Sequence, residues 1–223
     1  MLEDTRILVT GVAGTLGQAT AEVAMAKGAE VIGLDVIEAD TLPFTGSYHR
    51  VDLLDRESTL ACINELGSFD ALINIAGGFT MGMDAAEPND EQWNWMFRIN
   101  VDTMRNAVMA ATPVFKARGR GKIVNIGALG ALSGQGAVSA YCCAKSSVMR
   151  LTESLSEELK AEGVNVNAVL PSIIDTPPNR EAMPDANFSE WVSPHKLAQV
   201  ICFLASENAS AVHGALLPVK GLV

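Results

Sequence analysis

The chain has 223 residues, of which 48% are hydrophobic and 19% charged, a balance typical of a packed α/β domain and not of a disordered segment. Its formal net charge of −10 leaves no basic stripe to neutralise nucleic-acid phosphates and no basic segment to hold an anionic membrane. We find no signal peptide, no apolar run as long as a membrane span, and no metal-ligand spacing among the four cysteines, so we expect a cytoplasmic protein with reduced thiols.

Short apolar runs alternate with longer helical patterns along the whole sequence. The expected strands are Arg6–Thr10, Glu30–Asp35, Tyr48–Asp52, Ala71–Ile75, Lys122–Ile126, Val164–Leu170 and Ala215–Val219. The expected helices are Leu16–Lys27, Arg56–Leu66, Asp90–Lys116, Ser139–Glu162 and Pro194–Ser206, with Asp55 and Ser193 as N-caps. Continuous apolar strands separated by helices predict a doubly wound parallel sheet with helices on both faces, in a single domain over residues 1–223.

One compositional break lies between Pro171 and Trp191. Prolines at positions 171, 177 and 178 are expected to exclude regular helix there. A loop of this length inside a compact domain often covers an active site, so residues 171–191 are predicted to form a substrate loop. The alternative is a plain surface excursion.

A glycine-rich turn, Thr10–Gly17, lies between the first expected strand and the first helix. Its glycines would let the backbone turn tightly and approach a pyrophosphate at the helix N-terminus. The predicted nucleotide-binding residues of this turn are Gly11, Gly14, Thr15, Leu16 and Gly17. Asp35 ends the second strand, where its carboxylate would bind both ribose hydroxyls and repel a 2′-phosphate. Because no Arg or Lys adjoins Asp35, NAD(H) is favoured over NADP(H).

Tyr141 and Lys145 stand four residues apart, on one face of an expected helix. An ammonium within roughly 4–6 Å favours the phenolate and would lower the tyrosine pKa by about 1–3 units. Such a pair suits general acid/base catalysis near neutral pH. The same spacing also occurs by chance in exposed helices. The pair indicates catalysis here because a glycine-rich turn lies upstream in the same chain.

Several motifs resemble the short-chain dehydrogenase/reductase family in order and spacing, over essentially the whole chain. They are Thr10–Gly17, Asn74-Ile75-Ala76-Gly77, Asn100, the pair Tyr141/Lys145, and Pro171 to Thr176. The resemblance implies a Rossmann-type sheet of seven parallel strands and an NAD(P)H-dependent oxidoreductase. The nucleotide would lie at the carboxyl ends of the strands.

The resemblance also implies individual roles. Tyr141, Lys145 and Asn100 would be catalytic, with Asn100 interrupting its helix and fixing a water that relays protons to Lys145. Lys145 would also hold the nicotinamide ribose. The other cofactor contacts would be Asp52 and Leu53 near the adenine, Asn74, Ala76 and Gly77 on the adenosine ribose side, and Pro171, Ile174 and Thr176 at the nicotinamide carboxamide.

The sequence departs from the family pattern at Ala128, thirteen residues before Tyr141. Most members have a serine there that hydrogen-bonds the substrate oxygen. Loss of a donor aimed at a developing oxyanion costs about 3–4 kcal/mol. Ordinary carbonyl reduction would then need Ser133 or Ser139 to substitute.

Within the family, the chain resembles the dihydropteridine reductases most. The similarity is carried by Gly127-Ala128, by Ala76-Gly77-Gly78-Phe79, by Ala168–Pro171 and by Asp175–Trp191. A quinonoid dihydropterin takes hydride into a conjugated ring, so no localised alkoxide forms and the serine is less needed. Phe79 and Trp191 would stack on a flat substrate or else pack in the core or the loop. The candidate substrate contacts are Phe79, Ala128, Asn179 and Trp191.

Three functions remain open at this point. The leading hypothesis is NADH-dependent reduction of a small molecule of the quinonoid dihydropterin type. The alternatives are a carbonyl or 3-oxoacyl reductase that works without the serine, and a protein that senses NADH without turnover. The resemblance further implies a homodimer, with a homotetramer as the larger alternative. Its contact surface would include Ala107, Val108, Ala110, Ala111, Val148 and Leu151.

Overall fold

A seven-stranded parallel sheet forms the centre of the computed structural model, which describes residues 1–38, 44–82 and 85–223. The strand order is β3-β2-β1-β4-β5-β6-β7. The strands are β1 (Arg6–Thr10), β2 (Glu30–Asp35), β3 (Ser47–Arg50), β4 (Ala71–Asn74), β5 (Gly121–Ile126), β6 (Val164–Pro171) and β7 (Leu216–Val219). The order reverses between β1 and β4, and doubly wound sheets bind ligands beyond the carboxyl ends of the strands at such a point.

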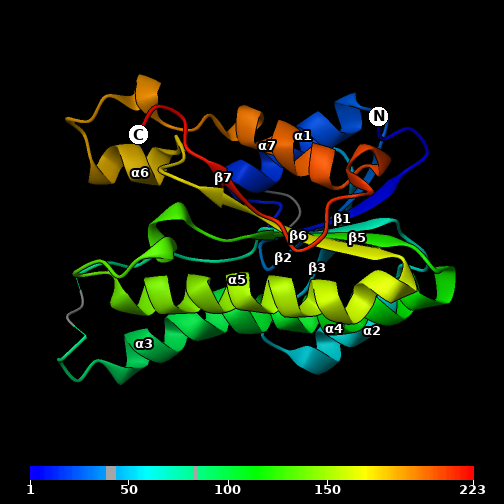
Figure 1. Cartoon of the computed structure of the whole chain (residues 1–223), viewed down its shortest axis with the longest axis horizontal. Helices are drawn as coiled ribbons and strands as arrows, with labels where there is room; N and C mark the ends of the chain where they lie inside the picture. The colour runs from blue at the N-terminus through cyan, green and yellow to red at the C-terminus, as the bar shows by residue number, and fades with distance from the viewer. Residues whose placement is uncertain (39–43, 83–84) are drawn as a thin grey trace.

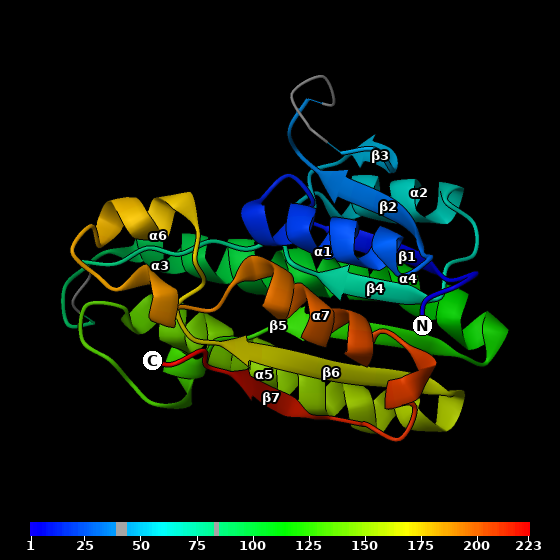
Figure 2. The same cartoon turned by 90° about the horizontal axis from the view of Figure 1, so that it is seen from above.

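Helices cover both faces of this sheet (Figures 1 and 2). One face carries α1 (Thr15–Ala26) and α7 (Pro194–Leu204), which pack against each other. The other face carries α2 (Arg56–Glu65), α4 (Thr103–Arg118) and α5 (Ser139–Leu159), with α3 (Asp90–Phe97) beside α5. The short helix α6 (Pro177–Ala182) lies beyond the carboxyl end of β6. The predicted doubly wound fold is confirmed.

Side-chain alternation along the strands builds two apolar cores. Ile7 and Val9 of β1 join the core under α1 and α7, whereas Leu8 joins the core under α2, α4 and α5. This follows from the two-residue period of a strand. Every residue of β4, β5 and β6 is buried, as expected for parallel strands covered on both faces.

Two expected strands end earlier than their apolar runs suggest. β3 stops at Arg50, and the Asp52 carboxylate accepts a hydrogen bond from Leu54 N at 2.9 Å, which turns the chain toward α2. β4 stops at Asn74 because Ile75 N donates to Thr10 Oγ1 at 3.1 Å instead of to a neighbouring strand. Side-chain hydrogen bonds therefore set both boundaries.

Helix caps agree with the sequence only in part. Asp55 caps α2 by accepting from Ser58 N at 3.1 Å, as predicted. Ser193 stands at the N-cap position of α7, but its side chain makes no capping hydrogen bond in the described structure.

The prolines after β6 do not exclude helix, so that expectation was wrong. Pro177 and Pro178 occupy the first turn of α6, where a missing N–H removes no intrahelical hydrogen bond. Thr176 caps this helix by accepting from Asn179 N at 3.4 Å. Within the described ranges, no helix is both long and apolar enough to cross a bilayer.

Candidate functional site

Two glycines of the turn between β1 and α1 stand where a side chain does not fit. Gly11 has φ +68°, and a Cβ on it would lie 2.7 Å from Ala76 N. A Cβ on Gly17 would lie 2.1 Å from the Gly11 carbonyl oxygen. Gly11 N also donates to Leu34 O at 2.8 Å, which joins the turn to β2. The turn is therefore a rigid cradle built from its own backbone.

This cradle fits an anionic group. Helix α1, all of which the structure describes, has no acidic residue in its first turn, and its N-cap residue Gly14 has no side chain to cap it. Gly14 and Thr15 are exposed, whereas Leu16 and Gly17 are buried beneath them. Free N–H groups and the positive end of the helix dipole suit a pyrophosphate.

Asp35 closes one side of the cradle. Its carboxylate accepts hydrogen bonds from Ala13 N at 2.9 Å and Val36 N at 2.8 Å. The expectation that no basic residue adjoins Asp35 was wrong in three dimensions, because Arg50 is its register partner on β3. Strand pairing, and not chain adjacency, brings this cation to the acid.

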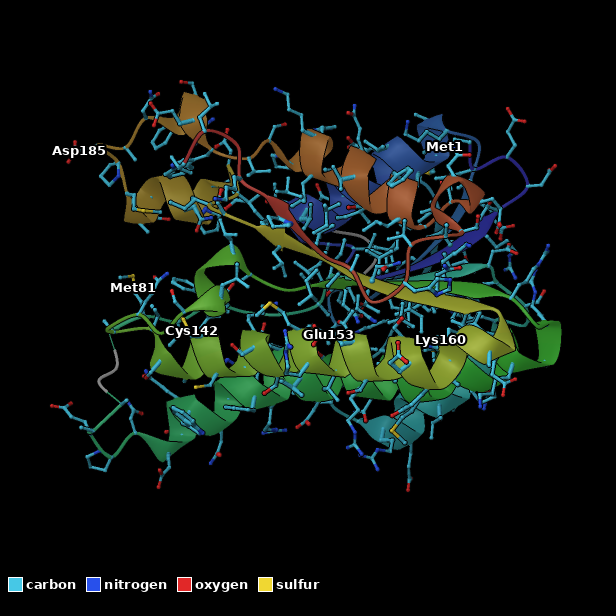
Figure 3. The ribbon with its side chains drawn as sticks, in the orientation of Figure 1. Met1, Met81, Cys142, Glu153, Lys160 and Asp185 are labelled. Carbon is cyan, nitrogen blue, oxygen red and sulfur yellow. The ribbon has the colours of Figure 1, made fainter. Side chains whose placement is uncertain are left out.

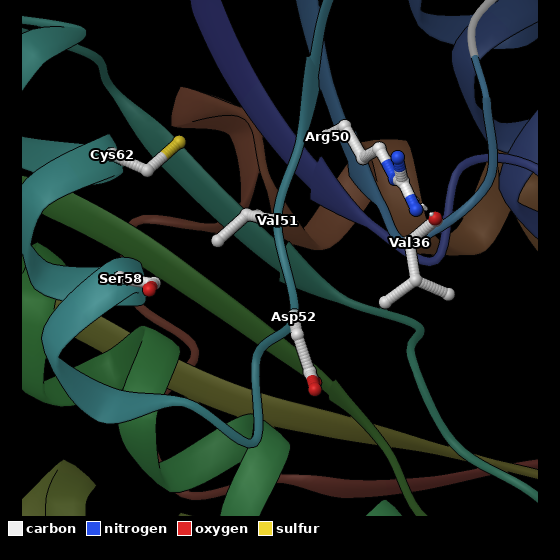
Figure 4. A pocket seen from close by; sticks show the side chains of 6 residues that line it. All are labelled: Val36, Arg50, Val51, Asp52, Ser58 and Cys62. Atoms are coloured by element: carbon white, nitrogen blue, oxygen red, sulfur yellow. Dashed lines mark hydrogen bonds between the residues drawn. The ribbon is translucent and has the colours of Figure 1, made fainter.

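A cavity of about 440 Å³ opens beside Asp35 (Figure 4). Its lining residues are Val36, Arg50, Val51, Asp52, Ser58 and Cys62. Burial raises the pKa of the Cys62 thiol and the nearby Glu65 adds to this shift, so the thiol presents a neutral surface. Leu53 is buried beneath, and its carbonyl accepts from Asn106 Nδ2 at 2.8 Å. This partly apolar space suits a flat heterocycle such as adenine.

Asn74, at the carboxyl end of β4, has an unpaired acceptor. Its Nδ2 donates to Asn125 Oδ1 at 2.8 Å. Its Oδ1 is buried and has no hydrogen-bond partner among the described residues. Because buried polar atoms are normally paired, this oxygen fits a hydroxyl or water that accompanies a bound ligand. Two residues further along the chain, Ala76 N donates to Thr10 Oγ1 at 3.2 Å.

Asn100 lies in a π-helical segment, Arg98–Asp102, between α3 and α4. The predicted helix interruption is therefore confirmed, and such bulges are frequent at functional sites. Asn100 Nδ2 donates to Met96 O and Gly78 O, both at 3.0 Å, and its Oδ1 accepts from Gly78 N at 3.2 Å. A Cβ on Gly77 would lie 2.8 Å from Asn100 Oδ1 and 3.5 Å from Lys145 Nζ. Gly77 thus leaves open the space between these two groups, where the water relay stays a prediction.

Lys145 and Tyr141 are both removed from water. Lys145 Nζ donates to Ile126 O at 2.9 Å and lies 6.0 Å from the centre of the Tyr141 ring. Burial lowers the pKa of Lys145 to about 8. Burial, with a smaller contribution from Cys142, raises the pKa of Tyr141 to about 12. The expectation that Lys145 lowers the pKa of Tyr141 was wrong for the chain without a ligand, because desolvation of the phenolate has the larger effect. Tyr141 therefore remains protonated at neutral pH.

Replacing Lys145 by Met should change how stability depends on pH. The folded-state pKa of about 8 lies below the ordinary 10.5, so the unfolded chain binds more protons between these values. The free energy of unfolding of the wild type should therefore rise by about 2 kcal/mol from about pH 7 to 9.5 through this one group. Lys145→Met should lack that rise.

Urea denaturation of both proteins at the two pH values measures this effect, and the comparison cancels titrations that the proteins share. If wild type and variant differed in unfolding free energy by the same amount at both pH values, the pKa of the Lys145 amine would not be lowered in the folded protein.

The substrate side of Tyr141 is apolar and aromatic. The Phe79 ring packs edge-on against Tyr141, with ring centroids 4.9 Å apart, and remains 56% exposed. Ala128 is buried and clusters with Tyr141 and Cys142. Ser139 Oγ, two residues before Tyr141, is buried and has no partner in the described structure, whereas Ser133 is exposed. The exposed Phe79 ring and the buried Ala128 thus both lie next to Tyr141.

In the segment after β6, the candidate residues make their contacts with other residues of the same segment. Asn179 Nδ2 donates to Ile174 O at 2.8 Å, and the Thr176 hydroxyl caps α6. Trp191 is only 6% exposed and packs on Phe188 with centroids 4.8 Å apart. The packing alternative for Trp191 therefore describes it better than substrate stacking. Pro171, at the end of β6, is buried.

In Figure 3 this segment lies at the end of the molecule where Asp185, Met81 and Cys142 are labelled. Asp185 marks its tip, and Met81 and Cys142 lie at the same end on the opposite side of the sheet. Arg180 was not among the predicted residues, and it donates two hydrogen bonds of 2.6 and 2.8 Å to Asp175. Opposite charges five residues apart across a helix start were the available signal. Arg50 was missed too, although pairing the second and third expected strands would have placed it beside Asp35.

The expected subunit contact surface lies inside the chain's own core. Ala107, Val108, Ala110, Ala111 and Val148 are all buried against the sheet, and Leu151 packs on the same cluster. The helices α4 and α5 turn these small residues inward, so the reason given for a dimer was wrong. In the described ranges, no group of histidine, cysteine and acidic residues is suited to a metal ion.

Comparisons with known proteins agree with this geometry. The family model for short chain dehydrogenases matches residues 5–187. The chain is 27% identical to the 3-oxoacyl-[acyl-carrier-protein] reductase of Thermotoga maritima, over 99% of this chain and 98% of the relative. It is 29% identical to a short-chain dehydrogenase/reductase of Talaromyces verruculosus, over 98% and 96%.

Among solved structures, a gluconate 5-dehydrogenase from Burkholderia cenocepacia in complex with NADP and tartrate is similar, with a TM-score of 0.89 and 27% identity. The similarity covers 99% of this chain and 95% of that one. The names of these relatives do not support a particular similarity to the dihydropteridine reductases. On its matched residues, its sheet and its nucleotide cradle, the chain belongs to the short chain dehydrogenase family and is an NAD(P)-dependent oxidoreductase.

Proposed function

We propose that this oxidoreductase uses NADH to reduce a small, flat, conjugated molecule of the quinonoid dihydropterin type. The observation that carries the proposal is Ala128, which is buried beside Tyr141 and offers no hydroxyl to a substrate oxygen. Hydride transfer to a localised carbonyl creates an oxyanion that needs such a donor. Transfer into a conjugated ring spreads the charge, so the donor matters less.

The cofactor would be held along the carboxyl ends of β1, β2 and β4. The glycine turn would bind the pyrophosphate, Asp35 the adenosine ribose, and the cavity at Asp52 the adenine. Asn74, Ala76 and Gly77 would line the ribose side, and Pro171, Ile174 and Thr176 the carboxamide side. When bound, the nicotinamide supplies a hydride.

The side chains of the protein would supply the proton that the substrate receives and would then re-protonate the donor. With a pKa raised to about 12, Tyr141 is protonated at neutral pH and would donate its phenolic proton to a ring nitrogen of the substrate. Lys145, with a pKa lowered to about 8, exchanges protons readily near neutral pH. Asn100 lies across the Gly77 gap from Lys145, so one water there would connect them to re-protonate Tyr141.

The substrate would enter between Phe79 and the cover formed by residues 171–191. The exposed Phe79 ring offers a face or an edge to a flat molecule, and such aromatic pairs add about 0.5–1.5 kcal/mol beyond area burial. Asn179 and Trp191 shape the cover from within.

The second candidate is a carbonyl reductase or dehydrogenase that works without the usual serine. Relatives named as 3-oxoacyl reductases and as gluconate 5-dehydrogenase favour it. The buried, unpaired hydroxyl of Ser139 would then be the replacement donor. A third possibility, NADH sensing without turnover, conflicts with the retention of Tyr141, Lys145 and Asn100.

The deciding experiment follows NADH oxidation by the purified protein with a quinonoid dihydropterin, with simple ketones and with 3-oxoacyl thioesters. Faster turnover of the pterin supports the proposal. Ketones or thioesters as better substrates would select the second candidate. Tight NADH binding without turnover of any of them would select the sensor.

Replacing Ala128 by Ser should raise the rate with simple ketones by about tenfold or more, because one oxyanion donor contributes about 10²–10³ in kcat. The rate with a quinonoid dihydropterin should stay within about threefold, since its product carries no localised oxyanion. Steady-state kinetics with both substrates measure the change. Ala131→Ser, at another buried alanine of the same cluster, is the matched control. Equal gains with both substrates would contradict the role given to Ala128.

We further propose a homodimer, or a homotetramer, that works in the cytoplasm with small molecules as its partners and without nucleic acid or membrane. The partly exposed Met109 on α4 marks an outward face on which a second copy would pack. Light scattering should give at least twice the chain mass of 23.6 kDa. A monomer at micromolar concentration would contradict it.

A further inference from the structure

Three charged side chains meet where the cofactor cavity opens beside the ribose-binding acid. Asp35 ends β2, Glu38 follows three residues later, and Arg50 ends β3. Arg50 is the register partner of Asp35, so their backbones lie about 4.8 Å apart across the sheet. Arg50 also lines the cavity.

The guanidinium of Arg50 is already engaged from two sides. Its Nε donates to the Val36 carbonyl at 2.9 Å, and its Nη1 pairs with the Glu38 carboxylate. Figure 4 shows the Arg50 side chain reaching toward Val36, whereas Cys62 and Ser58 line the cavity from the other side of Val51 and Asp52. The backbone contact holds the guanidinium at the rim, and Glu38 neutralises it there.

Tyr48 gives independent evidence that Asp35, Glu38 and Arg50 lie close to the same place in the structure. Its hydroxyl donates to the Ile37 carbonyl, between Asp35 and Glu38 in the chain. Burial raises its pKa first, the Asp35 and Glu38 carboxylates raise it further, and Arg50 lowers it. Besides burial, therefore, two carboxylates and one guanidinium all act on the Tyr48 hydroxyl.

We propose that the Arg50–Glu38 pair sets cofactor selectivity: while Glu38 holds Arg50, the site rejects a 2′-phosphate, and Arg50 freed from Glu38 binds it. The inference rests on the nucleotide site of the proposed function and goes beyond the role of Asp35. A guanidinium is the preferred partner of a phosphate because it can donate two parallel hydrogen bonds. Glu38 prevents this by occupying one edge of the guanidinium and by adding a second negative charge beside Asp35.

The test compares dissociation constants of NADH and NADPH, measured directly by nucleotide fluorescence with no substrate present. Wild type should bind NADH more tightly. Glu38→Gln should shift the ratio of the two constants toward NADPH by about tenfold, mainly through tighter NADPH binding. Because the Arg50 and Glu38 side chains are both exposed, the shift should shrink as salt is raised.

Arg50→Met in the Glu38→Gln background should cancel the shift, because no cation then remains at the rim. The matched control is Glu157→Gln, which removes the carboxylate of another exposed pair, Lys160–Glu157, on α5 and the turn after it. That variant should keep the wild-type ratio. Thermal unfolding of every variant shows that each is folded.

Several outcomes would overturn the inference: no binding of either nucleotide, a ratio within about twofold of wild type in Glu38→Gln, or a shift that survives Arg50→Met. A shifted ratio without pterin turnover would remove only the substrate assignment. Pterin turnover with an unmoved ratio would remove only the role of the Arg50–Glu38 pair.

Discussion

Replacing Tyr141 by Phe should lower kcat by about two to four orders of magnitude, the usual contribution of a positioned general acid. The ring, its edge-on contact with Phe79 and its packing against Ala128 would all be kept, so only the proton donor is lost. The dissociation constant of NADH should stay within about twofold, because the cradle at Gly11 lies on other elements.

The measurement is the steady-state rate with the best substrate from the panel, together with NADH binding. Thr112→Val is a suitable control, since it removes a hydroxyl that bonds only the Val108 carbonyl within α4 in the described structure. If Tyr141→Phe kept more than about a tenth of the wild-type kcat, Tyr141 would not be the proton donor.

Replacing Gly17 by Ala should weaken NADH binding by at least about a hundredfold. The new methyl group would lie 2.1 Å from the Gly11 carbonyl oxygen and 2.7 Å from Val12 Cα, so the backbone of the turn must move. Overpacking of this kind also costs about 1–3 kcal/mol of stability. Because phosphate binding depends on the placement of backbone N–H groups, a displaced turn loses its ligand.

Fluorescence titration with NADH and thermal unfolding measure the two effects. Gly134→Ala is the matched control, because its Cβ would have no described atom within 4 Å. The variant Gly17→Ala should unfold at a lower temperature but still cooperatively. NADH affinity within about threefold of wild type would show that the turn does not hold the pyrophosphate.

The order of strands and helices could be predicted because it depends on local patterns. Continuous apolar runs mark strands that must be covered on both faces, and the helical periods between them favour a doubly wound parallel sheet. The glycine-rich turn could also be predicted from the sequence, since Gly11 and Gly17 stand where no side chain fits. The interruption at Asn100 came from family resemblance, and the structure shows it as a π-helical segment.

Other features depended on contacts between distant parts of the chain. Arg50 reaches Asp35 only through the pairing of β2 with β3. The inward direction of Ala107 and Ala111 depends on how α4 rotates onto the sheet. Trp191 is buried beside the C-terminal segment of the chain, where Leu222 N donates to Glu190 O at 2.8 Å. None of these contacts has a signal within one local segment.

By itself, the sequence determined the fold, the nucleotide cradle and the residue pair Tyr141/Lys145, because spacing along one strand, turn or helix follows from backbone geometry. Only the tertiary structure decided the protonation of that pair and the neighbours of Asp35. Desolvation sums over every element that packs around a group, so burial raises the pKa of Tyr141 to about 12 although Lys145 stands one turn away. Likewise, the partner of a charge at a strand end is set by sheet register, which a single strand does not contain.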